Sequence, residues 1–228
     1  MLQSRSKYTV LVVFLVILIY FTACARVQSP TYTTTPSGTK PVTEKQPVQE
    51  PPAVEPQAGI SPEVQELLNK YKTKLRSINY KYKGPETADN FHDFYVKGDK
   101  IKYLPWLAIK TLDKPESYDS VFVDKTARTI QNYCLAAYCT YKGKKSELSY
   151  ADAYIKTIFD WLEGITEAEK LGEEVIDDRS TWKIQTNNGI LWIDTFYGIP
   201  LKVESFGKNY RFQQLSVNGV TDADVTPP

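Results

Sequence analysis

The stretch that decides the fold is 180–217, which reads STWKIQTNNGILWIDTFYGIPLKVESFGKNYRFQQLSV. Apolar and polar side chains alternate in it, with Trp182 and Ile184 separated by Lys183. Successive side chains of a strand point to opposite faces, so this alternation indicates half-buried strands separated by Asn- and Gly-containing turns. Together with the residues just before it, the stretch predicts five antiparallel strands: 172–177, 180–186, 190–195, 201–206 and 210–217.

The region before this meander predicts one helix followed by more strands. Ser61 can cap a helix, Pro62 suits its first position, and apolar residues at helical spacing continue it to about Arg76. Alternation then begins at Ile78, which indicates a change to strands. The predicted strands are 78–83, 91–96, 100–112 with a bend at Pro105, 119–123 and 128–133.

A second helix is predicted between the two groups of strands. Ser149 can cap it, with Asp152 as the acidic residue of a capping box, and Gly164 can end it. Its apolar stripe consists of Ala151, Tyr154, Ile155, Ile158 and Leu162.

The N-terminus, residues 1–24, predicts export across a membrane. Arg5 and Lys7 precede an apolar run from Tyr8 to Ala23, which is shorter than a spanning helix of about 20 residues and fits a signal peptide. The run ends in FTAC, which resembles the lipobox of bacterial lipoproteins and marks Cys24 for lipidation. An uncleaved signal anchor is the alternative. Both place the chain on the extracytoplasmic face of the cell membrane.

Residues 25–60 predict a disordered stalk, because this Pro- and Thr-rich stretch has few large apolar side chains. The folded domain is therefore 61–228. If Cys24 carries lipid, Cys134 and Cys139 remain as a pair, and in an oxidising compartment a disulfide between them is expected. The alternative is that the two cysteines form a redox or metal-binding pair. A zinc site needs four ligands, however, and His92 is the only histidine that could join them.

Nothing in the composition indicates an enzyme or a nucleic-acid binder. The net charge is only +1, without the basic excess of nucleic-acid-binding domains. His92 is the single histidine, and an acidic cluster at residues 173–178 has neither the facing carboxylates of a catalytic pair nor the spacing of a calcium loop. We expect no catalytic residue, metal or cofactor, and a monomer.

The aromatic residues predict a ligand cavity. Two helices can cover only part of so large a sheet, and an incompletely filled curved sheet leaves an apolar hollow. The alternative is that these rings are ordinary core residues. The candidate cavity residues are Tyr80, Tyr82, Trp106, Trp182, Trp192 and Phe212.

The C-terminal motifs resemble those of the LolA-like lipoprotein carriers. Members have a strand that ends in Trp-Ile-Asp, here Trp192-Ile193-Asp194, followed by a Leu-Pro-Leu-Lys-like strand, here Ile199-Pro200-Leu201-Lys202. The Asp-rich end that leads into Pro227-Pro228 is also similar. The resemblance covers roughly residues 61–228. It implies an α+β fold: a strongly curved antiparallel half-barrel with helices over its concave side, which holds acyl chains.

The sequence therefore predicts a membrane-tethered lipoprotein that binds a lipid or the acyl chain of a lipidated protein. A tether and a stalk favour a receiver, holder or sensor over a carrier that diffuses between membranes. Two alternatives remain: a stalked protein-binding or sensory domain with a filled core, and an envelope enzyme that uses His92 or the acidic cluster.

Overall fold

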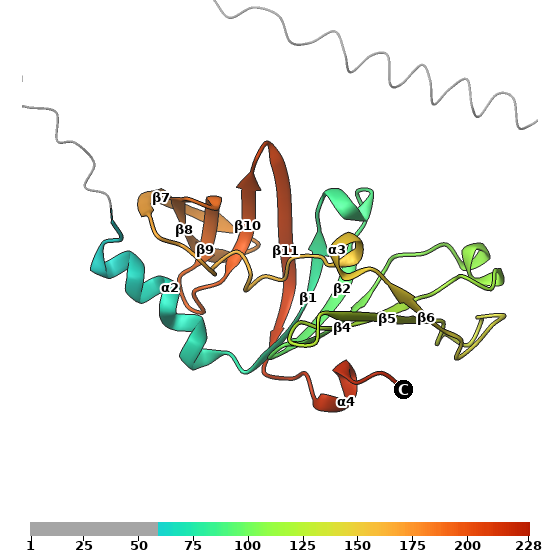
Figure 1. Ribbon diagram of the computed structural model, residues 1–228. Coiled ribbons are helices and arrows are strands. Elements are labelled where there is room, and N and C mark those ends of the chain that lie inside the picture. Colours follow the sequence, from blue (N-terminus) through green and yellow to red (C-terminus); the bar gives the residue numbers. More distant parts are fainter. Residues whose placement is uncertain (1–58) are drawn as a thin grey trace, which may run out of the picture. The chain divides into compact units, whose positions relative to one another are not determined.

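The computed structural model describes residues 59–228, so the predicted signal peptide, Cys24 and nearly all of the stalk lie outside the described residues. Figure 1 shows one open, curved sheet with short helices beside it. The helices are α2 (Pro62–Lys74), α3 (Tyr150–Ala153) and α4 (Asp222–Val225), with 3-10 turns η1 (Pro85–Thr87) and η2 (Ile109–Asp113). The strands are β1 (Ser77–Lys83), β2 (His92–Lys97), β3 (Lys100–Leu104), β4 (Ser120–Asp124), β5 (Thr129–Tyr133), β6 (Lys145–Leu148), β7 (Ala168–Ile176), β8 (Arg179–Thr186), β9 (Gly189–Asp194), β10 (Pro200–Ser205) and β11 (Lys208–Val217).

Two meanders form a single sheet of eleven strands. The strand order is β6-β5-β4-β3-β2-β1-β11-β10-β9-β8-β7, and every neighbouring pair is antiparallel. The meanders join where β1 pairs with β11, for example Tyr82 opposite Phe212. β6 and β7 are the two edges, so the sheet is not closed into a barrel. This confirms the predicted fold class.

The main core lies on one face of the sheet, which we call the inner face. Tyr80, Phe94 and Phe212 point into it from three adjacent strands, and each is at most 1% exposed. Helix α2 covers part of this face and buries Val64 and Leu67 there. Ser61 caps the helix and Pro62 begins it, as the sequence predicts.

The Trp-Ile-Asp motif has a structural role at the end of β9. The Asp194 carboxylate accepts hydrogen bonds from the backbone N–H of Phe196 (3.1 Å) and Tyr197 (2.6 Å) and from Arg179 Nε (2.7 Å). The turn that it stabilises lies against α2, because Lys70 Nζ donates to the Thr195 carbonyl at 3.1 Å. A buried carboxylate at this position therefore connects the sheet to its covering helix.

The predicted second helix is wrong beyond its first turn. Helix α3 ends at Ala153, and Tyr154–Ile165 cross the inner face as irregular chain, which we call the strap. Ser149 makes no side-chain cap, whereas the N–H and Oγ1 of Thr157 donate to the Asp160 carboxylate at 2.5 and 2.8 Å. These hydrogen bonds hold Thr157 in a turn in the middle of the predicted helix, which explains why the helix does not continue.

The third predicted strand is also shorter than expected. It ends at Leu104 instead of 112, because Pro105 cannot donate to the ladder and the chain then leaves the sheet toward η2. Strand β6 was not predicted. It is a mostly exposed edge strand of four residues with little apolar alternation to mark it. Within residues 59–228, none of the helices has the length and apolar character needed to span a bilayer.

Candidate functional site

One carboxylate connects several parts of the strap and fixes it to a neighbouring hairpin. Asp160 accepts hydrogen bonds from Lys125 Nζ (2.6 Å) and from the Tyr154 hydroxyl (2.6 Å), besides the two from Thr157. Burial would raise the pKa of Asp160, but the hydrogen bonds from Lys125, Tyr154 and Thr157 outweigh it and lower that pKa. The charged carboxylate is therefore the stable form, and it connects the strap to the β4–β5 hairpin through Lys125.

The apolar side of the strap packs into the core. Ile158 is fully buried and Trp161 is 3% exposed. The backbone N–H of Ile158 donates to the Tyr80 hydroxyl at 3.1 Å, and burial raises the pKa of this tyrosine well above its usual value. The strap thus takes the place that the predicted helix would have occupied.

Three of the six predicted cavity residues lie together in the centre of the inner face. The rings of Tyr80 and Tyr82 both lie 5.6 Å from the ring of Phe212, centroid to centroid, and Tyr80 stacks on Phe94 at 5.4 Å. At these separations the rings pack directly against each other. They are core residues in this structure, and their contact with a ligand stays a prediction.

The three predicted cavity tryptophans are dispersed. Trp106 is 60% exposed on the β3–β4 connection, away from the core. Trp192 is buried on the opposite, outer face, where Lys183 and Lys202 lie over its ring. Trp182 is half-buried at the margin of the main core, with Lys170 Nζ 3.6 Å from its ring centroid. The structure does not bring these three residues into one site.

One hollow, of about 360 Å³, is lined by Phe212 and Leu201, and further open space lies beside α2. The first hollow there, of about 320 Å³, separates the helix from the end of the strap, with Leu68, Tyr71, Leu162 and Ile165 among its lining residues. A second hollow of about 820 Å³ lies between residues 59–62 and strands β7 and β8. Both are lined by Ile60, so we treat them as one feature and call it the groove. Ile60 itself bridges Ala168 at the start of β7.

The groove has the size of a small-molecule site, but polar groups make up much of its lining. Ligand pockets have volumes of roughly 300–1,000 Å³ and mainly apolar walls. The smaller hollow has an apolar side formed by α2 and the strap, while the rim of the larger one carries charges of both signs, at Glu167, Glu169 and Lys170. Sequence reasoning missed the smaller hollow because its wall at Leu162 and Ile165 depends on the irregular path of the strap.

The residues considered for catalysis have structural roles. His92 is 8% exposed, and its Nδ1 accepts the backbone N–H of Trp106 at 3.2 Å. The acidic cluster is distributed along the edge strand β7 and the turn after it, where Glu173 pairs with Lys170 (2.7 Å) and Asp177 pairs with Arg211 (3.0 Å). His92, Glu173 and Asp177 therefore each have a separate partner.

The predicted disulfide between Cys134 and Cys139 is confirmed. Asp119 lies beside it and accepts hydrogen bonds from the backbone N–H of Leu135 (3.0 Å) and Ala136 (2.7 Å). Disulfide sulfurs are not the thiolates that bind metals, so the grouping of Asp119 with the two cysteines is structural. A disulfide in a small domain is typical of an oxidising, extracytoplasmic compartment.

Comparison with known proteins finds relatives only among solved structures. No family model and no curated protein matches the chain. The crystal structure of lipoprotein LppX from Mycobacterium tuberculosis is 16% identical, with a TM-score of 0.43 over 71% of this chain and 96% of that one. A LolA superfamily protein from Nitrosomonas europaea is 12% identical, with a TM-score of 0.33 over 72% and 97%.

The crystal structure of MucB is a further match. It is 15% identical, with a TM-score of 0.41, and the match covers 74% of this chain but only 64% of the MucB chain. The chain therefore spans less than two thirds of the length of MucB. At these identities the likeness concerns the fold alone.

Proposed function

We propose that this domain binds an elongated hydrophobic ligand, such as an acyl chain, in the groove beside α2. The observation that carries the proposal is the incomplete cover of the inner face: one helix and an irregular strap leave a hollow between Leu68 and Leu162 that adjoins a larger one at Ile60. Burying apolar surface there stabilises a complex by about 0.8 kcal/mol per methylene. Because the rim carries charges of both signs, it does not select a lipid headgroup of one charge. The site is therefore expected to recognise the acyl part of the ligand.

We also propose that the domain works while tethered to the outer side of the cytoplasmic membrane. The apolar run from Tyr8 to Ala23 and the FTAC sequence that ends at Cys24 support this location, as does the disulfide. A tethered domain would hold or receive a lipidated partner without diffusing between membranes. Mass spectrometry of the mature N-terminus tests the tether: a diacylated or triacylated Cys24 is expected, and an unmodified, uncleaved Met1 would contradict lipidation.

Ligand binding is tested with the domain purified under native conditions. We expect lipid to be extracted from it in near-stoichiometric amount, and the delipidated protein to bind a fluorescent fatty acid. Ile165→Trp should lower the affinity at least about tenfold, because the larger ring fills the smaller hollow. Val175→Trp, on the exposed edge of β7, is the matched control and should bind normally.

A second candidate function is favoured by the packed centre of the inner face. Direct contact among Tyr80, Phe94 and Phe212 supports a domain that binds a protein through its surface and needs no ligand. The lipid-binding and the protein-binding candidates predict different results in the lipid-extraction and fatty-acid-binding experiment. A folded domain that carries no lipid and binds no fatty acid would exclude the groove as a lipid site and favour the protein-binding candidate.

A further inference from the structure

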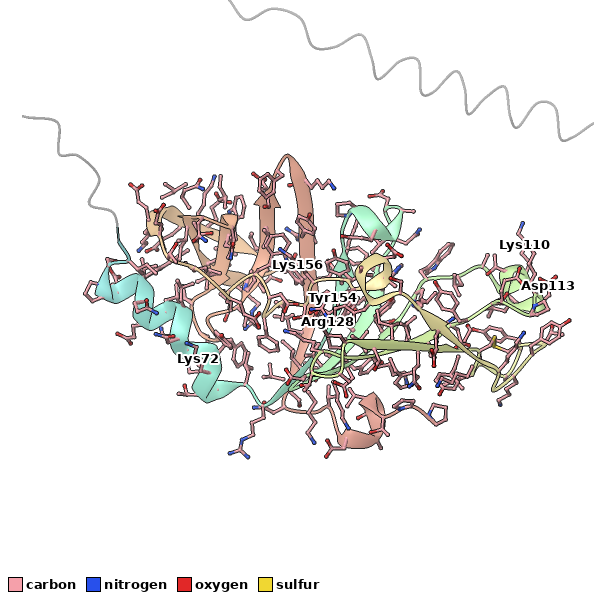
Figure 2. All side chains as sticks on the ribbon, viewed as in Figure 1. Lys72, Lys110, Asp113, Arg128, Tyr154 and Lys156 are labelled. Atoms are coloured by element: carbon pink, nitrogen blue, oxygen red, sulfur yellow. A yellow bond between two sulfur atoms is a disulfide. The ribbon has the colours of Figure 1, made fainter. Side chains whose placement is uncertain are left out.

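One end of the sheet carries exposed aromatic and aliphatic side chains that the groove does not use. They lie on the connections β3–β4 (105–119) and β5–β6 (134–144), which we call the loop platform. Figure 2 labels Lys110 and Asp113 at this end of the molecule. The large apolar side chains exposed on it are Trp106 (60%), Ile109 (66%), Tyr138 (58%), Tyr141 (41%) and Leu107 (36%).

The base of the loop platform is fixed, although its tips are exposed. Leu112 packs with the disulfide in a small cluster separate from the main core, and the Thr140 N–H donates to the Leu112 carbonyl at 3.3 Å. The Asp119 carboxylate joins the root of one connection to the start of the other. The hydrogen bond to His92 fixes the backbone of Trp106 while the indole stays exposed. These apolar groups are therefore presented to solvent by a braced structure.

The charges around the exposed rings are mainly positive. Lys110, Lys114, Lys142 and Lys144 are exposed on the loop platform, against the two exposed carboxylates Asp113 and Glu116. Tryptophan and tyrosine beside lysine is the composition that prefers the headgroup region of a bilayer, whereas lysine is depleted in protein–protein interfaces. Lysines near an anionic leaflet each contribute about 1 kcal/mol of attraction. The charge pattern is thus complementary to a lipid surface.

We infer that the loop platform is a docking surface for a membrane that contains anionic lipids. Trp106, Ile109 and Tyr138 enter the headgroup region, and the surrounding lysines contact lipid phosphates. Residues 25–58 span at most roughly 120 Å when extended, so a domain tethered at Cys24, as in the proposed function, stays within reach of such a surface. The docking surface is separate from the groove and does not require that the groove hold a ligand.

The inference is tested by flotation of residues 55–228, a compact unit with its own core that lacks the apolar N-terminal run. The vesicles contain either 30% phosphatidylglycerol in phosphatidylcholine or phosphatidylcholine alone. We expect at least about tenfold stronger partitioning to the anionic vesicles, weakened by 0.5 M salt. A blue shift of tryptophan fluorescence should accompany binding, because Trp106 is by far the most exposed of the four tryptophans.

Two pairs of variants separate the apolar and the charged contributions. Trp106→Ala with Ile109→Ser should lower partitioning at least about tenfold, while Phe206→Ser, which removes a 96% exposed ring in the β10–β11 turn, should not change it. Lys110→Glu with Lys142→Glu should lower it about thirtyfold or more, while Lys72→Glu with Lys208→Glu should have a much smaller effect. Thermal melting of each variant confirms that it is folded.

Three results would overturn the inference. One is equal binding to both kinds of vesicle, and another is loss of binding in the control variants to the same degree. The third is no binding to either vesicle by the folded domain. In that case the loop platform is better explained as a protein interface, and lipid extraction from the groove remains a separate measurement.

Discussion

At the scale of single residues, His92 shows how a candidate catalytic group becomes a structural one. It is the first residue of β2 and almost fully buried, with its ring parallel to that of Tyr103. Loss of solvent around the imidazole lowers its pKa, and the Trp106 N–H, which points at Nδ1, requires that this nitrogen stay unprotonated. The neutral ring therefore acts as a hydrogen-bond acceptor that positions an exposed tryptophan.

This environment predicts a pH-dependent stability that depends on one side chain. Because the folded state holds the His92 pKa below its unfolded value near 6.5, the unfolded chain takes up a proton first as the pH falls. The free energy of unfolding should therefore decrease below about pH 6.5, by at most about 1.4 kcal/mol per pH unit. His92→Asn keeps an acceptor but does not titrate. Urea unfolding from pH 8 to 5 measures the free energy of unfolding of the unsubstituted protein and of the variant. The difference between these two free energies should change only below pH 7, and a difference that stays constant over the whole range would contradict the prediction.

The three dispersed tryptophans show what the sequence could not predict at this scale. Trp182 alternates with Lys183, so its face could be predicted. Trp192 lies between Leu191 and Ile193, and a strand that is apolar on both faces gives no such signal. The pairing of Lys183 with Trp192 places that ring on the outer face, which only the register of β8 and β9 reveals.

At the scale of elements, the strands of the C-terminal meander were predictable and the strap was not. Alternation in β8, β10 and β11, together with the Asn- and Gly-containing turns that flank β9, located these four strands to within two residues at each end. In the strap, Ile155, Ile158 and Leu162 have helical spacing and are indeed buried, but in irregular chain. The Thr157-x-x-Asp160 pattern is the signal that could have indicated a break there.

The contact between α2 and the β9–β10 turn predicts a sharp sensitivity at one glycine. Gly198 has a φ of +72°, and an added Cβ would collide with the carbonyl oxygen of Leu67 in α2. Gly198→Ala should therefore lower the free energy of unfolding by at least about 2 kcal/mol, from backbone strain and displacement of the helix.

Gly143 is the matched control for this substitution. Its φ is +78°, but a Cβ there would meet nothing within 4 Å. Gly143→Ala should lower the free energy of unfolding by only about 1 kcal/mol, which is the strain of an alanine in the left-handed conformation. Chemical denaturation of both variants measures the difference, and equal losses would show that the approach of the turn to α2 is not tight.

At the scale of the whole molecule, the main core and the loop platform are stabilised separately. The disulfide cluster around Leu112 is distinct from the core of the inner face. Cys134→Ser with Cys139→Ser should therefore lower the free energy of unfolding by about 2 kcal/mol, the loop-closure contribution expected for so short a loop.

The same variant should keep the main core intact. We expect the tryptophan and tyrosine bands of the near-ultraviolet circular dichroism spectrum to be kept, because the buried rings of the inner face stay packed, and faster amide exchange confined to residues 105–119 and 134–144. Collapse of the whole fold on loss of the disulfide would contradict the separation of the two clusters.

The strand order also determines how the domain would rest on a bilayer. Ile60, the second described residue, adjoins β7 at one edge of the sheet, whereas the loop platform belongs to strands β3 to β6 on the side of the other edge. Eleven strands at about 4.8 Å spacing separate these edges by up to about 48 Å. A domain docked through the loop platform would therefore hold the groove, which adjoins β7, at the end of the sheet opposite to the docked one.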